Sequence, residues 1–477
     1  MLEQHSFFRN SSYKIFTLLF AIVVVVFTIL KIQTIATPYF WDELGVYVPG
    51  ALKMMDNGTI GLLPSSLEPL YSRGHPLLFV FSQASWFHLV GDTPAAGHSF
   101  SIMLAVATLI VFYYCARDLF GNKIAFVSSA LLAVQPMFFA MAGVILPEMM
   151  LTLFTIPAIW AIVKNRWVIF AITGSLAMMT KESAIIIPPL AMLVIFVDSL
   201  LEKRVFSLRN ISRYILAAVP FMIYGLFLII QKKQNGWYFF PEHMGYLRLD
   251  ASLIEQLWII ARDTLLEQGR TLPGIFIIAV GVIVNLRRNA FRRTINIFIL
   301  FVLACIAFAD LNFYLSRYML YALPFVVLGG VYGAQFLFLK MQTKWQTTAL
   351  GTFIAVTAIT SFLSMDTGKF EDTADMSYLH LVQTKQEAIS WLEQQPWKDS
   401  VIEANFPIFQ ALSDMRNGYL SVKPFSISVN YEKRAPYGLW FHFKEDENIV
   451  WDGRPYTIIK RWKCLMLLSV QLNPDHT

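Results

Sequence analysis

Two acidic sites in the sequence have the residue types that a general base needs. The first is the adjacent pair Asp42 and Glu43, in the segment WDE that follows the first apolar run. The second is Glu148, in LPEMM, which stands between strongly apolar stretches where water solvates a carboxylate poorly. Either site could take a proton from a reacting hydroxyl or amine. The plainer alternative is structural, because Asp42 could cap a helix and Glu148 could balance the charge of a helix N-terminus.

Basic and aromatic side chains in other segments could bind an anion such as a phosphate. Arg317, followed by Tyr318 in SRYMLYALP, has a guanidinium suited to bidentate phosphate contact. Lys181 in TKESAIIIPP and His75 in RGHP could add positive charge. Each also has a structural alternative. Arg317 could anchor a helix at the interface, Lys181 could pair with Glu182, and the ring of His75 could be merely hydrogen-bonded.

The sequence assigns no cofactor and leaves a divalent metal open. His75, the weaker candidate His243 and a Glu could form a metal site, but no ligand spacing indicates one. Cys115, Cys305 and Cys464 are isolated from one another, which excludes a disulfide framework and a Cys-based zinc site.

The composition indicates which elements must carry these residues. Of 477 residues, 56% are hydrophobic and 15% are charged, too few charges to cover a soluble protein of this size, so much of the surface must face lipid. The net charge of +6 comes from short basic clusters between apolar runs, as in cytoplasmic loops. This pattern argues against nucleic-acid binding.

The apolar runs predict an all-α, multi-pass membrane domain over residues 1–364. A span needs about 20 apolar residues, and Lys and Arg gather on the cytoplasmic side. With every basic cluster in the cytoplasm, the chain has eleven spans, a cytoplasmic N-terminus and an outer C-terminus, as expected in a bacterial inner (plasma) membrane. The first span is expected to stay uncleaved. The expected spans are 15–36, 95–115, 123–141, 148–163, 167–180, 184–200, 214–231, 271–286, 294–310, 318–339 and 346–364.

Two long loops are expected on the outer face, at 37–94 and 232–270. The first contains a short apolar helix at 76–90 that is expected to lie in the interface, and the second an amphipathic surface helix at 252–268.

A composition change after Asp366 predicts a small soluble domain on the outer (periplasmic) side, over 365–477. Polar residues interleave there with short strand-like segments at 400–404, 419–429 and 456–462, and a helical run precedes them. The domain is therefore predicted to be α/β.

On this topology the acidic and basic candidates come from different segments and lie at one depth on the outer side. Independent structural roles would scatter them over both faces. A transporter or flippase of a lipid-linked saccharide is the main alternative to an enzyme, but transporters place charged groups near the bilayer midplane. A non-catalytic assembly protein is a third alternative, and the presence of both acidic sites argues against it.

In order, the motifs WDE, GHPLL, ARDLFGNK, LPEMM, TKESAIIIPP and SRYMLYALP resemble those of the GT-C class of membrane glycosyltransferases. The resemblance covers roughly residues 15–330 and is nearest to the protein O-mannosyltransferase and lipid A aminoarabinose transferase branch (glycosyltransferase family 39 and its relatives). Such enzymes take sugars from polyprenyl-phosphate carriers. The resemblance therefore implies an inverting transfer to a lipid, glycan or protein acceptor on the outer face of the membrane that the protein spans.

The resemblance also implies roles for individual residues. Asp42 would be the catalytic base, with Glu43 beside it. Glu148 would orient the acceptor or support the base. Arg317 and the adjacent Tyr318 would bind the lipid phosphate with help from Lys181, and His75 replaces a Lys that the aminoarabinose branch often has before this proline.

Overall fold

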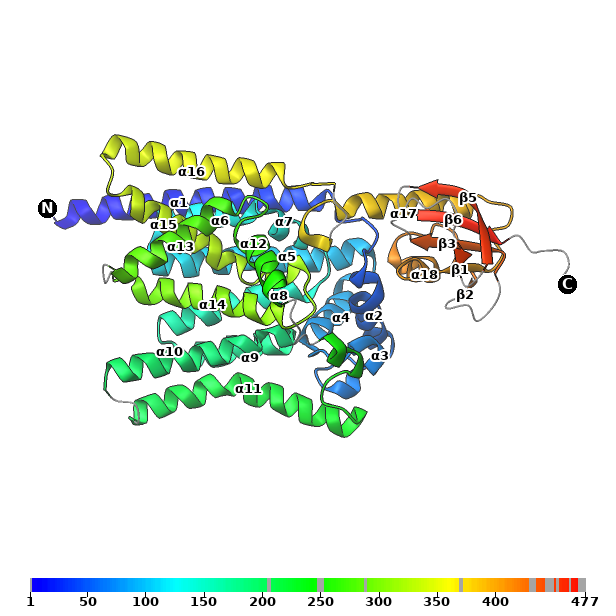
Figure 1. Cartoon of the computed structure of the whole chain (residues 1–477), viewed down its shortest axis with the longest axis horizontal. Coiled ribbons are helices and arrows are strands. Elements are labelled where there is room, and N and C mark those ends of the chain that lie inside the picture. Colours follow the sequence, from blue (N-terminus) through cyan, green and yellow to red (C-terminus); the bar gives the residue numbers. More distant parts are fainter. Residues whose placement is uncertain are drawn as a thin grey trace.

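The computed structural model describes residues 2–203, 207–246, 253–286, 290–368, 372–428, 435–441, 450–451, 454–462 and 465–470. Cys464 lies outside the described residues. Long helices run side by side as a bundle, and a small domain with a sheet lies at one end (Figure 1). The N-terminus lies at the opposite end of the bundle. Which side of the membrane each end faces stays a prediction.

Every expected span coincides with helix. The bundle helices are α1 (Leu2–Ile32), α5 (Pro94–Phe120), α6 (Asn122–Ala133), α7 (Pro136–Met141), α8 (Pro147–Val163), α9 (Trp167–Thr180), η3 (Glu182–Ile186) with α10 (Ile187–Leu201), α11 (Leu208–Asn235), α13 (Thr271–Leu286), α14 (Arg292–Asp310), α15 (Leu323–Phe338) and α16 (Thr343–Leu363). In the described part of the chain, six are long and apolar enough to cross a membrane: Lys14–Ile32, Pro94–Phe120, Glu182–Leu201, Leu208–Asn235, Arg292–Asp310 and Thr343–Leu363. The full count of eleven stays a prediction.

Two of the expected spans are not single regular helices, and a proline explains the first of them. The predicted span 123–141 is two helices, because Pro136 disfavours helical backbone at Gln135, which has ψ 128°. The predicted span 318–339 begins instead as a short 3-10 turn, η5 (Ser316–Met319), and the regular helix starts only at Leu323. Pro324 fits this first turn, where no backbone N–H donor is needed.

Lipid-facing and packed surfaces follow the chemistry of the residues. On α1, Leu18, Val25 and Ile29 are each more than half exposed, as expected of side chains that face lipid rather than water. Between α13 and α15 the helices approach closely. A Cβ atom at Gly330 would lie 2.5 Å from the Cα of Pro273, so only glycine permits this contact.

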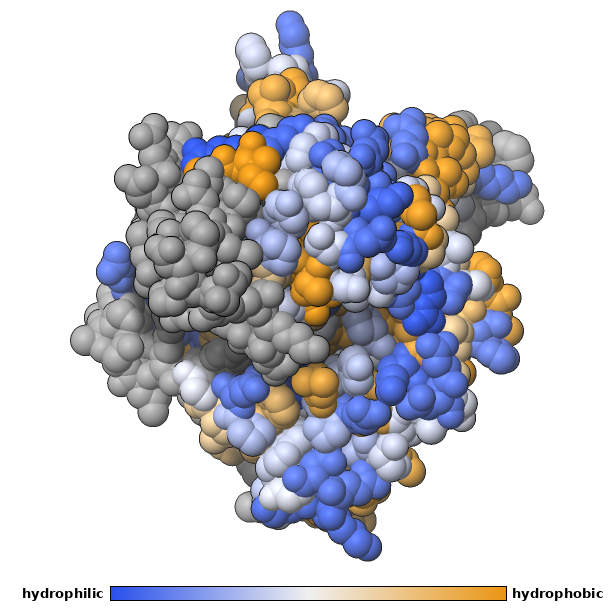
Figure 2. Space-filling view, turned by 90° about the vertical axis from the view of Figure 1, so that its right-hand side faces the viewer, coloured by the Kyte–Doolittle hydropathy of each residue, from blue (hydrophilic) through white to orange (hydrophobic). Residues whose placement is uncertain are grey.

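Short helices cover the end of the bundle nearest the sheet domain (Figure 1). From the first predicted loop these are η1 (Glu43–Tyr47), α2 (Val48–Asp56), η2 (Pro64–Ser66), α3 (Pro69–Ser72) and α4 (Leu78–Val90), and from the second η4 (Pro241–Tyr246). The second loop also contains α12 (Leu253–Leu265), which packs against α14. α4 and α12 coincide with the two expected interfacial helices. Viewed onto this end, hydrophilic residues cover much of the described surface (Figure 2).

The C-terminal domain has a six-stranded mixed sheet in the order β2-β1-β3-β6-β5-β4, with β1 parallel to both of its neighbours. Its elements are η6 (Asp372–Ala374), α17 (Tyr378–Glu393), β1 (Ile402–Ala404), α18 (Ile408–Ser413), η7 (Met415–Asn417), β2 (Ile427–Ser428), β3 (Tyr437–Phe441), β4 (Val450–Trp451), β5 (Arg454–Trp462) and β6 (Leu465–Val470). The expected strands at 400–404 and 456–462 lie in β1 and β5. The expected strand at 419–429 was too long, because only β2 pairs.

Candidate active site

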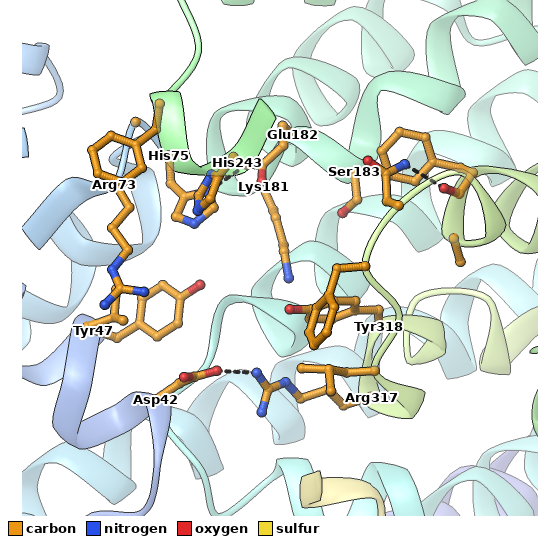
Figure 3. Close-up of a pocket in the computed structure, with 18 of the residues that line it drawn as sticks. Asp42, Tyr47, Arg73, His75, Lys181, Glu182, Ser183, His243, Arg317 and Tyr318 are labelled. Atoms are coloured by element: carbon orange, nitrogen blue, oxygen red, sulfur yellow. Dashed lines mark hydrogen bonds and ion pairs between the residues drawn. The ribbon is translucent and has the colours of Figure 1, made fainter. Parts of the chain in front are cut away.

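A cavity of about 750 Å³ opens at the end of the bundle nearest the C-terminal domain. Its walls come from η1, the turn after α3, η3, η4 and η5, so segments far apart in the sequence meet there (Figure 3). The polar and charged lining residues are Asp42, Tyr47, Arg73, His75, Lys181, Glu182, Ser183, Tyr224, His243, Asn312, Arg317, Tyr318 and Tyr321.

The predicted base and the predicted phosphate ligand contact each other directly. Nη2 of Arg317, on η5, donates a hydrogen bond to Oδ2 of Asp42, at the start of η1 (Figure 3). Both side chains line the cavity, and the carboxylate is the more open of the two, since the Arg317 side chain is 3% exposed and that of Asp42 is 26% exposed. Trp41, immediately before Asp42, has the left-handed φ of 41°. Non-glycine residues in that region are strained, and such strain clusters at functional sites.

A second buried ion pair adjoins the first. Nζ of Lys181 lies 2.6 Å from Oε1 of Glu148, in the first turn of α8, and Nε of Arg317 lies 3.8 Å from the same oxygen. Lys181 also lies over the ring of Tyr318, 3.9 Å from its centroid. Glu148 is 1% exposed and is not among the cavity-lining residues. Asp42, Arg317, Glu148 and Lys181 thus form one chain of alternating charges, in which Glu148 supports the two cations from behind.

The alternative pairing of Lys181 with Glu182 is not what the structure shows. Glu182 instead accepts from Nδ1 of His75, at 3.0 Å. The ring of His243 lies 5.0 Å from the ring of His75, centroid to centroid. Burial, and then the charge of His75, lowers the pKa of His243 to about 4. His243 is therefore neutral near pH 7 and can offer a hydrogen bond but not a charge.

The described residues contain no group of three or more His, Cys, Asp or Glu side chains arranged to hold a metal ion. The two histidines and the Glu that the sequence left open as a metal site correspond to His75, His243 and Glu182, which lie close together but are not among such groups.

Glu43, predicted to act beside Asp42, is not brought to the cavity. Its carboxylate is 1% exposed and accepts hydrogen bonds from the backbone N–H groups of Phe40 and Ile145, both at 2.6 Å. Nε2 of His98 lies 3.2 Å from the same carboxylate. Adjacent side chains at the start of a helix leave the backbone in different directions, so Asp42 faces the cavity and Glu43 faces the bundle. The contacts of Glu43 fix the position of the loop that carries Asp42.

Arg73 lines the cavity and was not among the predicted ligands. It ends α3 with the left-handed φ of 46°, and Gly74 follows with φ 73°. Among the described residues, Arg73 has no carboxylate partner, in contrast to Lys181 and Arg317. In the sequence, its place beside the glycine of RGHP was the only indication of an unusual backbone position.

The remaining cavity wall is apolar. It is formed chiefly by apolar side chains from η4 with its preceding turn and from α14 with its following turn, namely the aromatic Phe239, Phe240, Phe308 and Phe313 and the aliphatic Met244. The cavity therefore has a charged side, with Asp42, Arg73, Lys181 and Arg317, and a side suited to hydrocarbon.

Comparisons with known proteins agree on one fold. Residues 74–230 match the family model described as dolichyl-phosphate-mannose-protein mannosyltransferase. The structure is similar to ArnT from Cupriavidus metallidurans bound to undecaprenyl phosphate, with a TM-score of 0.60 and 13% identity over 95% of this chain and 97% of that chain. The chain has the GT-C glycosyltransferase fold. It is also similar to the archaeal oligosaccharyltransferase AglB from Archaeoglobus fulgidus, with a TM-score of 0.53 and 10% identity over 88% of this chain and 69% of that chain. No curated protein sequence matches significantly.

The resemblance to GT-C membrane glycosyltransferases that the motifs indicated is thus confirmed. The family match begins at Gly74 and contains Glu148 and Lys181, whereas Asp42 and Arg317 lie outside it. Outside residues 74–230, the GT-C likeness therefore depends on the structural comparison, which covers 95% of this chain.

Proposed function

We propose that this protein is a glycosyltransferase of a bacterial inner membrane, which transfers a sugar from a polyprenyl-phosphate carrier to an acceptor at the outer surface. The observation that carries this proposal is the placement of Asp42 against Arg317 in a cavity with one charged and one apolar side. The charged side suits a phosphate and the apolar side suits an isoprenoid chain. A GT-C fold is consistent with both.

The reaction assigned to this site is a displacement with inversion at the anomeric carbon. Asp42 accepts the proton of the acceptor hydroxyl or amine as the oxygen or nitrogen forms its bond to that carbon. The bond from the same carbon to the phosphate oxygen breaks, and the polyprenyl phosphate leaves with the electron pair. Cations stabilise the negative charge on the leaving phosphate.

Arg73 and Arg317 contribute the guanidinium groups of the charged side, and we assign them different steps in binding the phosphate. Arg317 is already neutralised by Asp42, whereas Arg73 has no carboxylate partner among the described residues. We infer that Arg73 is the first ligand of the donor phosphate, and that the phosphate then competes with Asp42 for Arg317. This competition would release Asp42 to act as the base. Lys181, Tyr318 and His75 complete the phosphate site.

The donor's hydrocarbon chain would lie along the aromatic wall and continue into the lipid. The acceptor would enter on the side of Asp42, and it is a lipid, a glycan or a protein. We infer a cytoplasmic N-terminus and an outer C-terminal domain, since the cavity must open where the acceptor is found.

Substitution of Arg73→Gln is expected to weaken binding of undecaprenyl phosphate about 10- to 100-fold, because a hydrogen bond to a charged group contributes roughly 1.5–3 kcal/mol. Binding would be measured with the purified protein in nanodiscs, with undecaprenol as the ligand that lacks the phosphate. Arg262→Gln, an exposed arginine on α12 that does not line the cavity, is the matched control. Equal affinity in the Arg73 and Arg262 variants would contradict the assignment.

Mass spectrometry of lipid-linked sugars and surface glycans, with and without the gene, tests the function itself. Loss of the protein is expected to cause a polyprenyl-phosphate sugar to accumulate and the corresponding glycan or lipid modification to disappear. A flippase would instead leave a lipid-linked saccharide on the cytoplasmic side, protected from enzymes added outside. Unchanged pools of lipid-linked sugars and glycans would refute the proposal.

A further inference from the structure

The C-terminal domain contacts the loop that carries Asp42 through the backbone. The N–H of Tyr39 donates to the carbonyl oxygen of Asn417 at 3.2 Å, and the hydroxyl of Tyr419 donates to the carbonyl oxygen of Tyr39 at 2.9 Å. Both Tyr39 and Tyr419 are buried. The backbone N–H and the backbone carbonyl of Tyr39, three positions before Asp42, are therefore both hydrogen-bonded to the C-terminal domain.

The next loop residue, Phe40, is enclosed by side chains of α17. Nζ of Lys385, a fully buried lysine, lies 5.2 Å from the centroid of the Phe40 ring and 4.9 Å from that of Tyr419. The ring of Tyr378 lies 5.4 Å from the ring of Phe40. Because the buried lysine side chain lies between the two rings, neither ring can move without disturbing this packing. Phe40 is also a lining residue of the cavity, and so is Leu381 of α17.

Phe406 packs against Trp41 and Gly45, on either side of Asp42 in the loop. Its ring meets that of Trp41 edge to face, at 5.5 Å between centroids. A Cβ atom at Gly45 would lie 2.5 Å from Cε2 of Phe406, so the ring rests directly on the backbone of η1. Trp41 keeps its left-handed φ of 41° only if its surroundings hold it there, and Phe406 supplies part of those surroundings.

The same domain also supports the partner of Asp42. η6, at the start of the C-terminal domain, packs against η5, which carries Arg317. Thr373 and Ala374 of η6 are buried there. Arg416 adds ion pairs to Asp56 at 3.1 Å and Asp92 at 3.7 Å, which join the domain to α2 and to the turn before α5.

We propose that the C-terminal domain is a positioning element of the active site, which holds the Asp42 loop from one side and η5 from the other. Phe406, Lys385 and Tyr419 are positioning residues, because they contact the loop and not the cavity. The domain thereby sets the geometry of the Asp42–Arg317 pair. The contact itself is independent of the reaction, whereas its consequence for catalysis rests on the proposed function.

Hydrogen–deuterium exchange of the full-length protein in nanodiscs tests this proposal. Substitution of Phe406→Ala is expected to raise amide exchange at least 10-fold in peptides covering 38–47, while the bundle helices and β1 keep wild-type exchange. Phe425→Ala, a half-buried phenylalanine of the same domain that lies next to β2 and outside α18, the helix that packs against η1, is the control and should leave the loop unchanged. Phe406→Tyr, which preserves the edge-to-face contact, should restore wild-type exchange.

A second variant covers the case in which Phe406→Ala unfolds the whole domain. Gly45→Ala forces a methyl group into the Phe406 ring from the loop side and should raise exchange in the same peptides without loss of the domain. Wild-type loop exchange in both variants would overturn the proposal.

Accumulation of the lipid-linked sugar donor in cells measures the catalytic consequence separately. Both loop-opening variants should accumulate donor, and Phe406→Tyr should not. Faster loop exchange with normal donor pools would overturn the positioning role. Failure of the proposed function would show differently, as normal donor pools even when the gene is absent.

Discussion

Substitution of Asp42→Asn is expected to reduce sugar transfer about 10²- to 10⁴-fold, the usual contribution of a general base. The amide has the shape of the carboxylate but cannot take the proton of the acceptor. Its carbonyl oxygen can still accept the hydrogen bond from Arg317, so the protein should fold and insert normally. The measurement is the ratio of accumulated polyprenyl-phosphate sugar to modified product in cells that carry only this variant.

The control for Asp42→Asn is the same chemical change at Asp118, a carboxylate on α5 that is about half exposed and pairs with Lys164. It lies outside the cavity, so Asp118→Asn should transfer sugar at the wild-type rate. Near-normal transfer by the Asp42 variant would exclude Asp42 as the base. The cavity would then have to provide the base elsewhere, and Glu182 is the other carboxylate among its described lining residues.

The bundle could be predicted from the sequence because lipid imposes a simple rule on it. Each apolar run must form its own backbone hydrogen bonds, so its length and composition are sufficient to locate a helix. The rule fails where a proline changes the local backbone, as at Pro136, and at η5, where the expected span 318–339 starts as a 3-10 turn. The rule also does not say how far into the bilayer a helix extends, so the helices alone do not give the number of crossings.

The candidate site could be predicted as a set of residues but not as a set of contacts. Lys181 and Glu182 are neighbours in sequence, which suggested an ion pair between them. The backbone at Lys181 is extended, with φ −157° and ψ 140°, and successive side chains of an extended chain point in opposite directions. Lys181 therefore reaches Glu148 and Glu182 reaches His75. Such a choice depends on local dihedral angles at the end of α9, which no periodicity in the sequence encodes.

The place of Arg73 in the cavity could not be predicted from the sequence, for a different reason. Its left-handed backbone places the guanidinium in the cavity, but most residues in such turns have no chemical role. The contacts of the C-terminal domain with the Asp42 loop could not be predicted from the sequence either. Asn417 and Tyr419 are far from Tyr39 in sequence, and their segment contains no motif that could indicate contact with the loop.

Substitution of Lys181→Met is expected to destabilise the folded protein by about 3–5 kcal/mol, because it leaves the buried carboxylate of Glu148 without its ion-pair partner at 2.6 Å. Arg317, with Nε at 3.8 Å, compensates only in part because Asp42 also engages it. The measurement is the free energy of unfolding in detergent micelles. Lys164→Met removes a lysine whose pair with Asp118 is well exposed to solvent and should cost less than about 1 kcal/mol.

A double-substitution cycle separates the ion pair from the packing of the two side chains. If the loss in Lys181→Met arises from an uncompensated charge, Glu148→Leu in the same chain should restore much of the stability, since well-packed apolar residues can replace a buried pair. The two changes should then be strongly non-additive. Additive losses would mean that Lys181 stabilises the fold through its contact with Tyr318 rather than through Glu148. In that outcome the role of Glu148 behind the two cations would have to be reassigned.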